Sequence, residues 1–317
     1  MSRYVEAHKK PAGAGDARPT ALQIINDEGL EDKLKDKVFL ITGTSSGLGI
    51  ETGRAIAATG ARVFLVVRSL EKGKEACASF LEPGRVELLQ LDTSSLSSVR
   101  AAAAAFLKKS PTLNVLICNA GIMMTPEREE SVDGFENQLA TNYLGHFLLF
   151  TLLKDALLKG STPEFNSRVV NVSSSGHHSS EIQFDDFQLK KEGAYDGSKA
   201  YGQSKLSQIY QANYIDRHYG PKGLHALSLM PGGIWTNLQR HFSDETMKNY
   251  KANETVNNFM KSPAQEWEGK GGKYLEDCDV AKPEMVPGMS GVAGYAYDEA
   301  KEERLWKLTL ETLGIKD

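Results

Sequence analysis

The chain is poor in cysteine, and its cysteines are widely spaced. It holds three among 317 residues, at positions 77, 118 and 278. This spacing fits neither a disulfide framework nor a set of metal ligands. We therefore expect reduced, structural thiols, no bound metal and a cytoplasmic protein.

Charge excess and long apolar runs are also absent. The formal net charge of −4 gives no electrostatic reason to expect nucleic acid as a partner. The longest apolar run, Phe147–Leu153, is interrupted by a threonine and is far shorter than the ~20 residues of a membrane-spanning helix. Met1–Thr20 is polar and lacks the apolar stretch of a secretory signal. We expect no integral membrane segment.

Strand-like and helix-like segments alternate from Val38 onward. The apolar runs typical of buried strands are Val38–Ile41, Arg62–Val67, Val86–Leu91, Val115–Cys118, Arg168–Val172 and Leu224–Leu229. The helix-like segments are Ile50–Ala58, Leu96–Lys108, Phe135–Leu158 and Tyr201–His218. This alternation predicts an α/β fold, a single Rossmann-type doubly wound parallel sheet with helices on both faces.

No internal repeat or linker divides the chain, so we expect one domain over residues 37–317. Residues 1–36 are expected to form an N-terminal arm, partly disordered, with a short helix within Thr20–Lys35. Ser243–Lys273 is polar, and the region of about residues 236–270 is expected to be a substrate loop. An ordinary surface excursion is the alternative.

A glycine-rich turn joins the first strand to the first helix. Gly43, Gly47 and Gly49 let the backbone bend sharply and approach a ligand closely. The helix start that follows presents free N–H groups and a partial positive charge, which suit a dinucleotide pyrophosphate. The spacing differs from the common G-x-G-x-x-G pattern, and glycine-rich turns also occur in loops that bind nothing.

Tyr201 and Lys205 lie four residues apart on a predicted helix, so both side chains share one face. A cation near the phenol should lower the tyrosine pKa and make it a general acid or base near neutral pH. Tyr195 and Lys199 have the same spacing, but Gly193 and Gly197 argue against a rigid helix there. Tyr195 is therefore interpreted as a substrate-loop or packing residue.

Polar residues and glycines also follow other strands. Ser174 follows the fifth strand, where a hydroxyl could hold a substrate oxygen or belong to a simple turn. Asn119–Gly121 and Pro231–Thr236 follow two further strands and allow the same two interpretations. Arg68, not an acid, follows the second strand. A guanidinium suits the 2′-phosphate of NADP, although a solvated surface charge is the alternative.

In order along the chain, these features resemble the short-chain dehydrogenase/reductase family, from about Lys37 to about Leu313. The branch most similar is that of retinol dehydrogenases and WW-domain oxidoreductases. The segments that carry this likeness are Arg168–Ser174 (RVVNVSS), Ala200–Leu206 (AYGQSKL), Gly271–Cys278 (GGKYLEDC) and Arg304–Trp306 (RLW).

The resemblance implies roles for individual residues. The catalytic set it implies is Ser174, Tyr201, Lys205 and Asn142. The cofactor-binding set is Gly43, Ser45, Ser46, Gly47, Leu48, Gly49, Arg68, Asp92, Asn119, Ala120, Gly121, Tyr201, Lys205, Pro231, Gly232, Ile234 and Thr236. In this assignment Tyr201 passes a proton to the substrate oxygen, Lys205 binds the nicotinamide ribose, and Asn142 supports a proton relay.

The expected function is an NADP-dependent oxidoreductase that interconverts a carbonyl and an alcohol on a small hydrophobic substrate, with homo-oligomerisation possible. His177, His178, Tyr195, Trp235 and the segment Ser243–Met260 are expected to surround that substrate. One alternative is a catalytically idle dinucleotide-binding scaffold or sensor. Another is an epimerase or dehydratase of nucleotide sugars, for which too few residues follow Pro231.

The sequence departs from the resemblance at one place. Relatives carry a helix after a Lys-Ser-Pro-x-Gln motif, but here Lys261–Gln265 continues directly into Glu266–Gly269. Loss of this helix is expected to expose apolar surface and to weaken folding or alter assembly.

Overall fold

An eight-stranded sheet organises the chain, with the strand order β3-β2-β1-β4-β5-β6-β7-β8. The structure, a computed structural model, describes residues 4–9, 12, 15–245, 247–248, 271–283 and 290–316. The strands are β1 Val38–Thr42, β2 Arg62–Val67, β3 Val86–Gln90, β4 Val115–Cys118, β5 Ser167–Val172, β6 Leu224–Leu229, β7 Tyr274–Glu276 and β8 Asp279–Val280. Neighbouring strands from β3 to β7 are parallel, and β8 returns antiparallel to β7.

The strand order reverses at β1. Phe39 of β1 pairs with Val63 of β2 on one side and with Val115 of β4 on the other. Chain connections leave toward opposite sides of such a point, so a crevice opens beyond the carboxyl ends of β1 and β4. The fold therefore places the ends of these strands where a ligand can enter.

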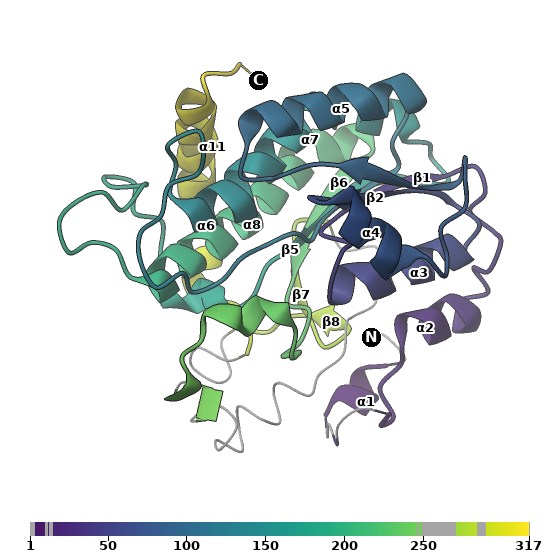
Figure 1. Ribbon diagram of the computed structural model, residues 1–317, viewed down its shortest axis with the longest axis horizontal. Helices are drawn as coiled ribbons and strands as arrows, with labels where there is room; N and C mark the ends of the chain where they lie inside the picture. Colours follow the sequence, from purple (N-terminus) through teal and green to yellow (C-terminus); the bar gives the residue numbers. More distant parts are fainter. Residues whose placement is uncertain are drawn as a thin grey trace.

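Helices cover both faces of the sheet (Figure 1). The α-helices are α1 Val5–His8, α2 Ala21–Asp27, α3 Leu48–Ala58, α4 Leu70–Cys77, α5 Leu96–Lys109, α6 Asn137–Leu139, α7 Gly145–Gly160, α8 Gly197–Tyr219 and α11 Glu299–Leu313. The shorter helical turns are η1 Ala140–Leu144, η2 Ser175–Ser179, η3 Gly220–Lys222, η4 Asn237–His241 and η5 Gly294–Ala296.

Alternate side chains along each strand enter two separate cores, because successive residues of a strand point to opposite faces. Leu40 and Phe64 pack with α5, α7, α8 and α11 on one face. Ile41 and Leu65 pack with residues of α3 and α4 on the other. This double coverage explains why the strands are continuous apolar runs.

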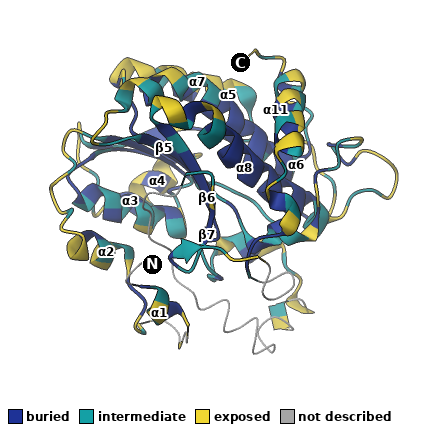
Figure 2. Cartoon of the chain, turned by 180° about the vertical axis from the view of Figure 1, so that it is seen from behind, coloured by how far each residue is buried: buried dark blue, intermediate teal, exposed yellow. Residues whose placement is uncertain are grey.

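The helix α8 is buried along most of its length (Figure 2). Its outer side is covered by α11, where the Trp306 ring stacks on Tyr214 at 3.8 Å between centroids. Asn213 of α8 donates a hydrogen bond from Nδ2 to Glu302 Oε1 at 2.8 Å. The C-terminal helix thus fixes α8, which carries Tyr201 and Lys205.

The predicted fold class is confirmed, and β2, β4 and β6 have the predicted bounds. The helix predicted over Phe135–Leu158 is wrong in detail, because α6, the π-helical turn η1 and α7 follow one another there. The helix predicted from Tyr201 begins earlier, at Gly197. The sequence interpretation missed α4 and α11, while α2 lies within the predicted Thr20–Lys35.

Most of the expected substrate loop, residues 236–270, lies outside the described residues, and so does the shortened segment Lys261–Gly269. Within the described residues, no helix is both long enough and apolar enough to cross a bilayer.

Candidate active site

A cleft of about 1070 Å³ opens at the carboxyl ends of the central strands. Its walls come from the glycine turn after β1, the ends of β2, β4 and β5, the first turns of α8, and the segment after β6. Residues far apart in the sequence meet here because parallel strands end at the same edge of the sheet.

The glycine turn forms one end of the cleft. Gly47 adopts a φ of +61° and begins α3 without any side-chain cap, so no side chain competes with a ligand for the first N–H groups of the helix. A Cβ on Gly49, by contrast, would lie 2.2 Å from the carbonyl oxygen of Gly43. Gly49 therefore serves the packing of the turn itself, and it is not among the residues that line the cleft.

Asn119 ties the end of β4 to this turn. Its Nδ2 donates to the carbonyl oxygen of Thr42 at 2.8 Å and to that of Gly43 at 3.3 Å. The backbone N–H groups of Asn119 and Ala120 both donate to Thr42 Oγ1 at 2.9 Å. Asn119 and Ala120 line the cleft, so the same contacts shape the wall between the two strand ends.

Ser174, Tyr201 and Lys205 line the cleft together. A Cβ on Gly176 would lie 2.6 Å from Tyr201 Cε1, so a glycine is needed for the ring to approach the η2 turn. Lys205 Nζ donates to the carbonyl oxygen of Val172 at 2.9 Å and to Gln208 Oε1 at 3.1 Å. The ammonium lies 5.5 Å from the centroid of the Tyr201 ring.

Burial dominates the pKa values of this pair. It raises the pKa of Tyr201 to about 12, opposed by a hydrogen bond with Ser174. It lowers the pKa of Lys205 to about 7. The prediction that Lys205 lowers the tyrosine pKa is therefore wrong for the protein alone, because burial of the phenol itself dominates and Lys205 is not among the groups that shift this pKa.

Asn142 lies behind the cleft wall, not in it. It is fully buried in the π-helical turn η1, and its Oδ1 accepts from the Ile122 N–H at 2.8 Å. Its Nδ2 donates to the Ile122 carbonyl at 3.0 Å and to Ser204 Oγ at 2.9 Å. Asn142 thus connects the segment that follows β4 to α8 at Ser204, one residue before Lys205.

Sequence reasoning missed His146, one turn after Asn142. Its Nδ1 is 2.9 Å from the Asn142 carbonyl and its Nε2 is 2.9 Å from Thr42 Oγ1. Burial lowers the pKa of His146 to about 4, so the ring is neutral. His146 lies within the predicted helix, but only its contact with Thr42 in the folded protein shows that it links the start of α7 to the end of β1.

The remaining predicted cofactor residues are placed as follows. Asp92 Oδ1 accepts hydrogen bonds from the backbone N–H of Ser94 at 2.9 Å and from its hydroxyl at 2.6 Å. Thr236 caps η4 by accepting from the Leu238 N–H at 3.1 Å. Those that line the cleft are Gly43, Ser45, Ser46, Gly47, Leu48, Arg68, Asp92, Gly121, Pro231, Gly232, Ile234 and Thr236.

The end of the cleft near β2 is rich in cations. Arg68 lines it, together with Lys72 and Arg240, which the sequence interpretation missed. In the described part of the chain, neither Arg68 nor Lys72 forms an ion pair. The spacing of four residues between Arg68 and Lys72, across the Ser69 cap of α4, could have indicated the second cation.

The residues expected around a substrate are placed elsewhere. His177 is fully buried, with its Nδ1 2.7 Å from the Ser174 carbonyl and its Nε2 accepting from the Ala293 N–H at 3.1 Å. His178 Nε2 is 3.2 Å from the Gly291 carbonyl. The Tyr195 hydroxyl is 2.6 Å from Thr125 Oγ1. These side chains, and Trp235, are not among those that line the cleft.

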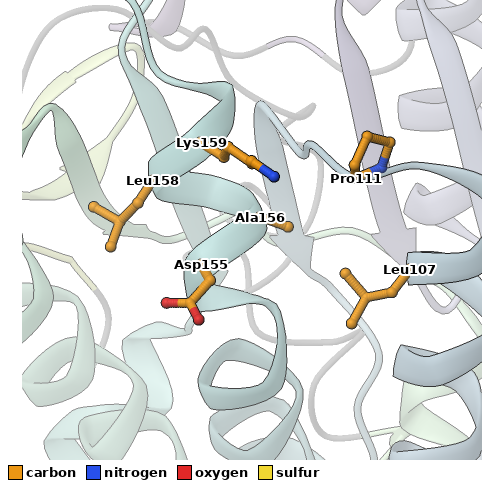
Figure 3. Close-up of a pocket in the computed structure, with 6 residues that line it drawn as sticks. All are labelled: Leu107, Pro111, Asp155, Ala156, Leu158 and Lys159. Carbon is orange, nitrogen blue, oxygen red and sulfur yellow. The ribbon is translucent and has the colours of Figure 1, made fainter.

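A shallow depression lies between the ends of α5 and α7 (Figure 3). Leu107, Pro111, Ala156 and Leu158 form its apolar surface, with Asp155 and Lys159 beside them. It holds no set of groups that suits catalysis. No cluster of three or more histidine, cysteine or acidic side chains suited to a metal occurs in the described ranges.

Sheet topology, glycine turn and cleft together define a Rossmann-type α/β protein. The family model described as short chain dehydrogenase matches residues 37–247. A protein named Short-chain dehydrogenase/reductase prx1, from Penicillium roqueforti, is 55% identical over 99% of this chain and 96% of its own. The chain therefore belongs to the short-chain dehydrogenase/reductase family, whose members are oxidoreductases that bind nicotinamide dinucleotides.

Two further proteins support this membership. Human retinol dehydrogenase 12 is 35% identical over 90% of this chain and 88% of its own. The crystal structure of a putative uncharacterized protein from Mycobacterium paratuberculosis has a TM-score of 0.65 and 31% identity, covering 88% of this chain and 94% of that one. The alignment with the Penicillium roqueforti protein runs over 329 positions, so that relative has residues that this 317-residue chain lacks.

Proposed function

We propose that this protein is an NADP-dependent oxidoreductase that interconverts a carbonyl and an alcohol on a small hydrophobic substrate. The observation that carries the proposal is the meeting of Ser174, Tyr201 and Lys205 in the same cleft as the glycine turn. A hydroxyl, a phenol and an ammonium in one cleft are suited to holding a substrate oxygen and moving a proton to or from it.

The cleft fits a nicotinamide dinucleotide. The uncapped start of α3 at Gly47 suits the pyrophosphate, and the backbone there approaches a ligand without a Cβ in the way. When bound, the nicotinamide would supply or accept the hydride. Tyr201 would give a proton to the substrate oxygen or take one from it, while the Ser174 hydroxyl holds the same oxygen.

Arg68 supports the choice of NADP over NAD. It stands where an acid would accept hydrogen bonds from a ribose 2′-hydroxyl. Lys72 and Arg240 line the same end of the cleft, so the local charge is positive. A planar guanidinium beside further cations suits a 2′-phosphate dianion.

Apolar side chains on the cleft wall support a hydrophobic substrate. Ile122, Met123 and Met124 follow β4, and Leu238 and Phe242 follow β6. Methionine side chains adapt to ligands of different shape. The wall therefore favours an apolar molecule carrying one polar group near Tyr201. Homo-oligomerisation and a cytoplasmic location stay predictions.

The test is oxidation of NADPH by the purified protein with a panel of aldehydes, steroid ketones and quinones, followed by absorbance at 340 nm. We expect turnover with at least one apolar carbonyl compound, and lower efficiency with NADH. Tight binding of NADPH without turnover in either direction across the panel would instead favour the scaffold or sensor function.

A further inference from the structure

Polar side chains lie side by side on three neighbouring strands beneath α8. Asn171 of β5 pairs in register with Ser228 of β6, which pairs with Tyr274 of β7. All three residues have no exposed surface. They point to the same face as Val169 and Ala226, which pack in the core that includes α8. Polar groups in such a place require an explanation, since burying them is costly.

Two glutamines of α8 meet this polar row. Asn171 Nδ2 donates to the backbone carbonyl of Gln208 at 2.9 Å and to Gln211 Oε1 at 3.2 Å. Gln208 and Gln211 are as buried as the strand residues, with exposed fractions of 0% and 1%. Two long amide side chains therefore sit in the interior, where apolar residues of similar volume would cost less free energy.

The side chain of Gln208 has one hydrogen-bond partner among the described residues, and that partner is Lys205. Its Oε1 accepts from Lys205 Nζ at 3.1 Å, while its Nε2 is buried with no partner. The orientation of the amide follows from chemistry, because an ammonium can only donate and must face the oxygen. Leaving Nε2 unpaired costs free energy. The hydrogen bond to Lys205 is therefore the one favourable polar contact that this buried side chain makes within the described residues.

Lys205 is held from two sides. Val172 accepts a second hydrogen bond from Nζ through its backbone carbonyl at 2.9 Å. An ammonium has three N–H groups, so one remains beyond these two. Lys205 and Gly121 both line the cleft, and a Cβ on Gly121 would lie 3.6 Å from Nζ. The remaining N–H group is therefore available to a molecule bound in the cleft.

We propose that Gln208 is a positioning residue for Lys205, whose buried side-chain carbonyl fixes the ammonium at the cleft wall and keeps it charged. The proposal rests on the proposed function insofar as that function uses Lys205. Burial disfavours the charged form of Lys205, and each carbonyl that accepts from the ammonium opposes this effect. Gln208 thereby sets the pH range over which Lys205 can serve the cleft. Besides Tyr201, the titratable groups near the ammonium in the described part of the chain are the buried Cys118 thiol of β4 and the neutral His146 ring of α7.

The test uses NADPH affinity across pH 6 to 9, measured by fluorescence titration, because binding can be followed without turnover. Gln208→Met keeps the length of the side chain and removes the acceptor. We expect this variant to bind NADPH more weakly. The inflection in its plot of NADPH affinity against pH should lie about one pH unit lower, because the free energy of one hydrogen bond to a charged group corresponds to about one pKa unit. Gln208→Glu keeps the shape and adds a negative charge, so its inflection should move to higher pH.

Gln211→Met is the matched control. It removes a buried glutamine from the same helix and the same polar row, but that side chain contacts Asn171 and not Lys205. If the two glutamines serve only to pack against the polar strand residues, Gln208→Met and Gln211→Met should change the pH dependence of NADPH affinity equally. We expect the Gln211 variant to keep the inflection of the unchanged protein. Because Gln208→Glu is nearly isosteric, it keeps the test decisive even where Gln208→Met folds poorly.

Lys205→Met separates the two possible failures. If this variant abolishes the inflection while both Gln208 variants leave it in place, the role of Gln208 is refuted and the role of Lys205 stands. If Lys205→Met binds NADPH and turns over substrate like the unchanged protein, both the proposed use of Lys205 and the role of Gln208 are refuted. Opposite shifts in the two Gln208 variants would support the proposal.

Discussion

Tyr195 and Tyr201 each begin a Tyr-x-x-x-Lys pattern, but their hydroxyl groups contact different residues. Tyr195 lies before α8, and its hydroxyl is 2.6 Å from Thr125 Oγ1 and donates to the Thr125 carbonyl at 2.9 Å. Tyr201 lies inside α8, lines the cleft and forms its hydrogen bond with Ser174. The partners of Tyr195 are therefore structural, whereas those of Tyr201 belong to the proposed chemistry.

Tyr201→Phe should abolish most turnover while leaving NADPH binding largely intact, because it removes the hydroxyl and keeps the ring. Loss of general acid–base catalysis alone is worth about 100- to 10,000-fold in rate. Tyr195→Phe is the control and should keep turnover near that of the unchanged protein. The measurement is kcat and NADPH affinity on one substrate. An inactive Tyr195 variant beside an active Tyr201 variant would move the assignment six residues upstream.

Arg68 allows a second prediction on a single side chain. Arg68→Asp should reverse or remove the preference for NADPH over NADH, because a carboxylate repels the 2′-phosphate and accepts from a 2′-hydroxyl. The loss of a charge-assisted contact corresponds to about 1.5–3 kcal/mol, or roughly 10- to 150-fold in NADPH affinity. Arg100→Asp, an exposed position on α5, controls for net charge. Tighter binding of NADH than NADPH by the unchanged protein would contradict the choice of cofactor.

The helix α11 packs against α8, the helix that carries Tyr201 and Lys205. Trp306 packs against Phe147 of α7 at 4.7 Å and against Tyr214 of α8 at 3.8 Å between ring centroids. The hydroxyls of Tyr143 and Thr309 are 2.9 Å apart, which connects α11 to the π-helical turn beside Asn142. The C-terminal helix thus contacts the two elements that carry Asn142, Tyr201 and Lys205.

Trp306→Ala should destabilise the protein by about 3–5 kcal/mol, the usual cost of deleting a large buried aromatic side chain. Trp306 is 3% exposed. Lys307→Ala, at the exposed neighbouring position of the same helix, should change stability by less than ~0.5 kcal/mol. Denaturant unfolding of both variants measures the difference. Equal stabilities of the two variants would show that α11 contributes little to the core.

For the molecule as a whole, buried titratable groups make stability depend on pH in opposite directions. Burial lowers the pKa of His146 to about 4, so the unfolded chain takes up this proton first as the pH falls. The stability from neutral His146 is complete above about pH 6.5 and is lost toward pH 4. Burial raises the pKa of Glu276 to about 7, so its contribution is lost as the pH rises from about 4.5.

His146→Gln should therefore flatten the acid side of the stability curve. Between pH 6.5 and 4 the unchanged protein should lose up to about 1.4 kcal/mol per pH unit more than the variant, which corresponds to one proton. Urea unfolding at several pH values measures both slopes, and Glu276 contributes equally to each. Parallel curves for the two proteins would mean that His146 takes up its proton without unfolding.

The sequence by itself determined the alternation of strands and helices, the glycine turn and the spacing that puts Tyr201 and Lys205 on one face of a helix, whereas the role of Ser174 came from the family resemblance. The first three depend on local properties: apolar runs of strand length, glycines at a bend, and two side chains one helical turn apart. Such patterns are written in neighbouring residues and can be interpreted without knowing what packs against them.

Only the tertiary structure decided which groups face each other across distant segments. Asn142 lies behind the cleft, and His177 and Tyr195 do not line it as expected. Lys72 and Arg240 line the same end of the cleft as Arg68. The tertiary structure also showed Lys205 held by Gln208 and Val172, and it reversed the expected direction of the Tyr201 pKa. Burial and hydrogen bonding arise from packing between elements, so no local pattern reveals them.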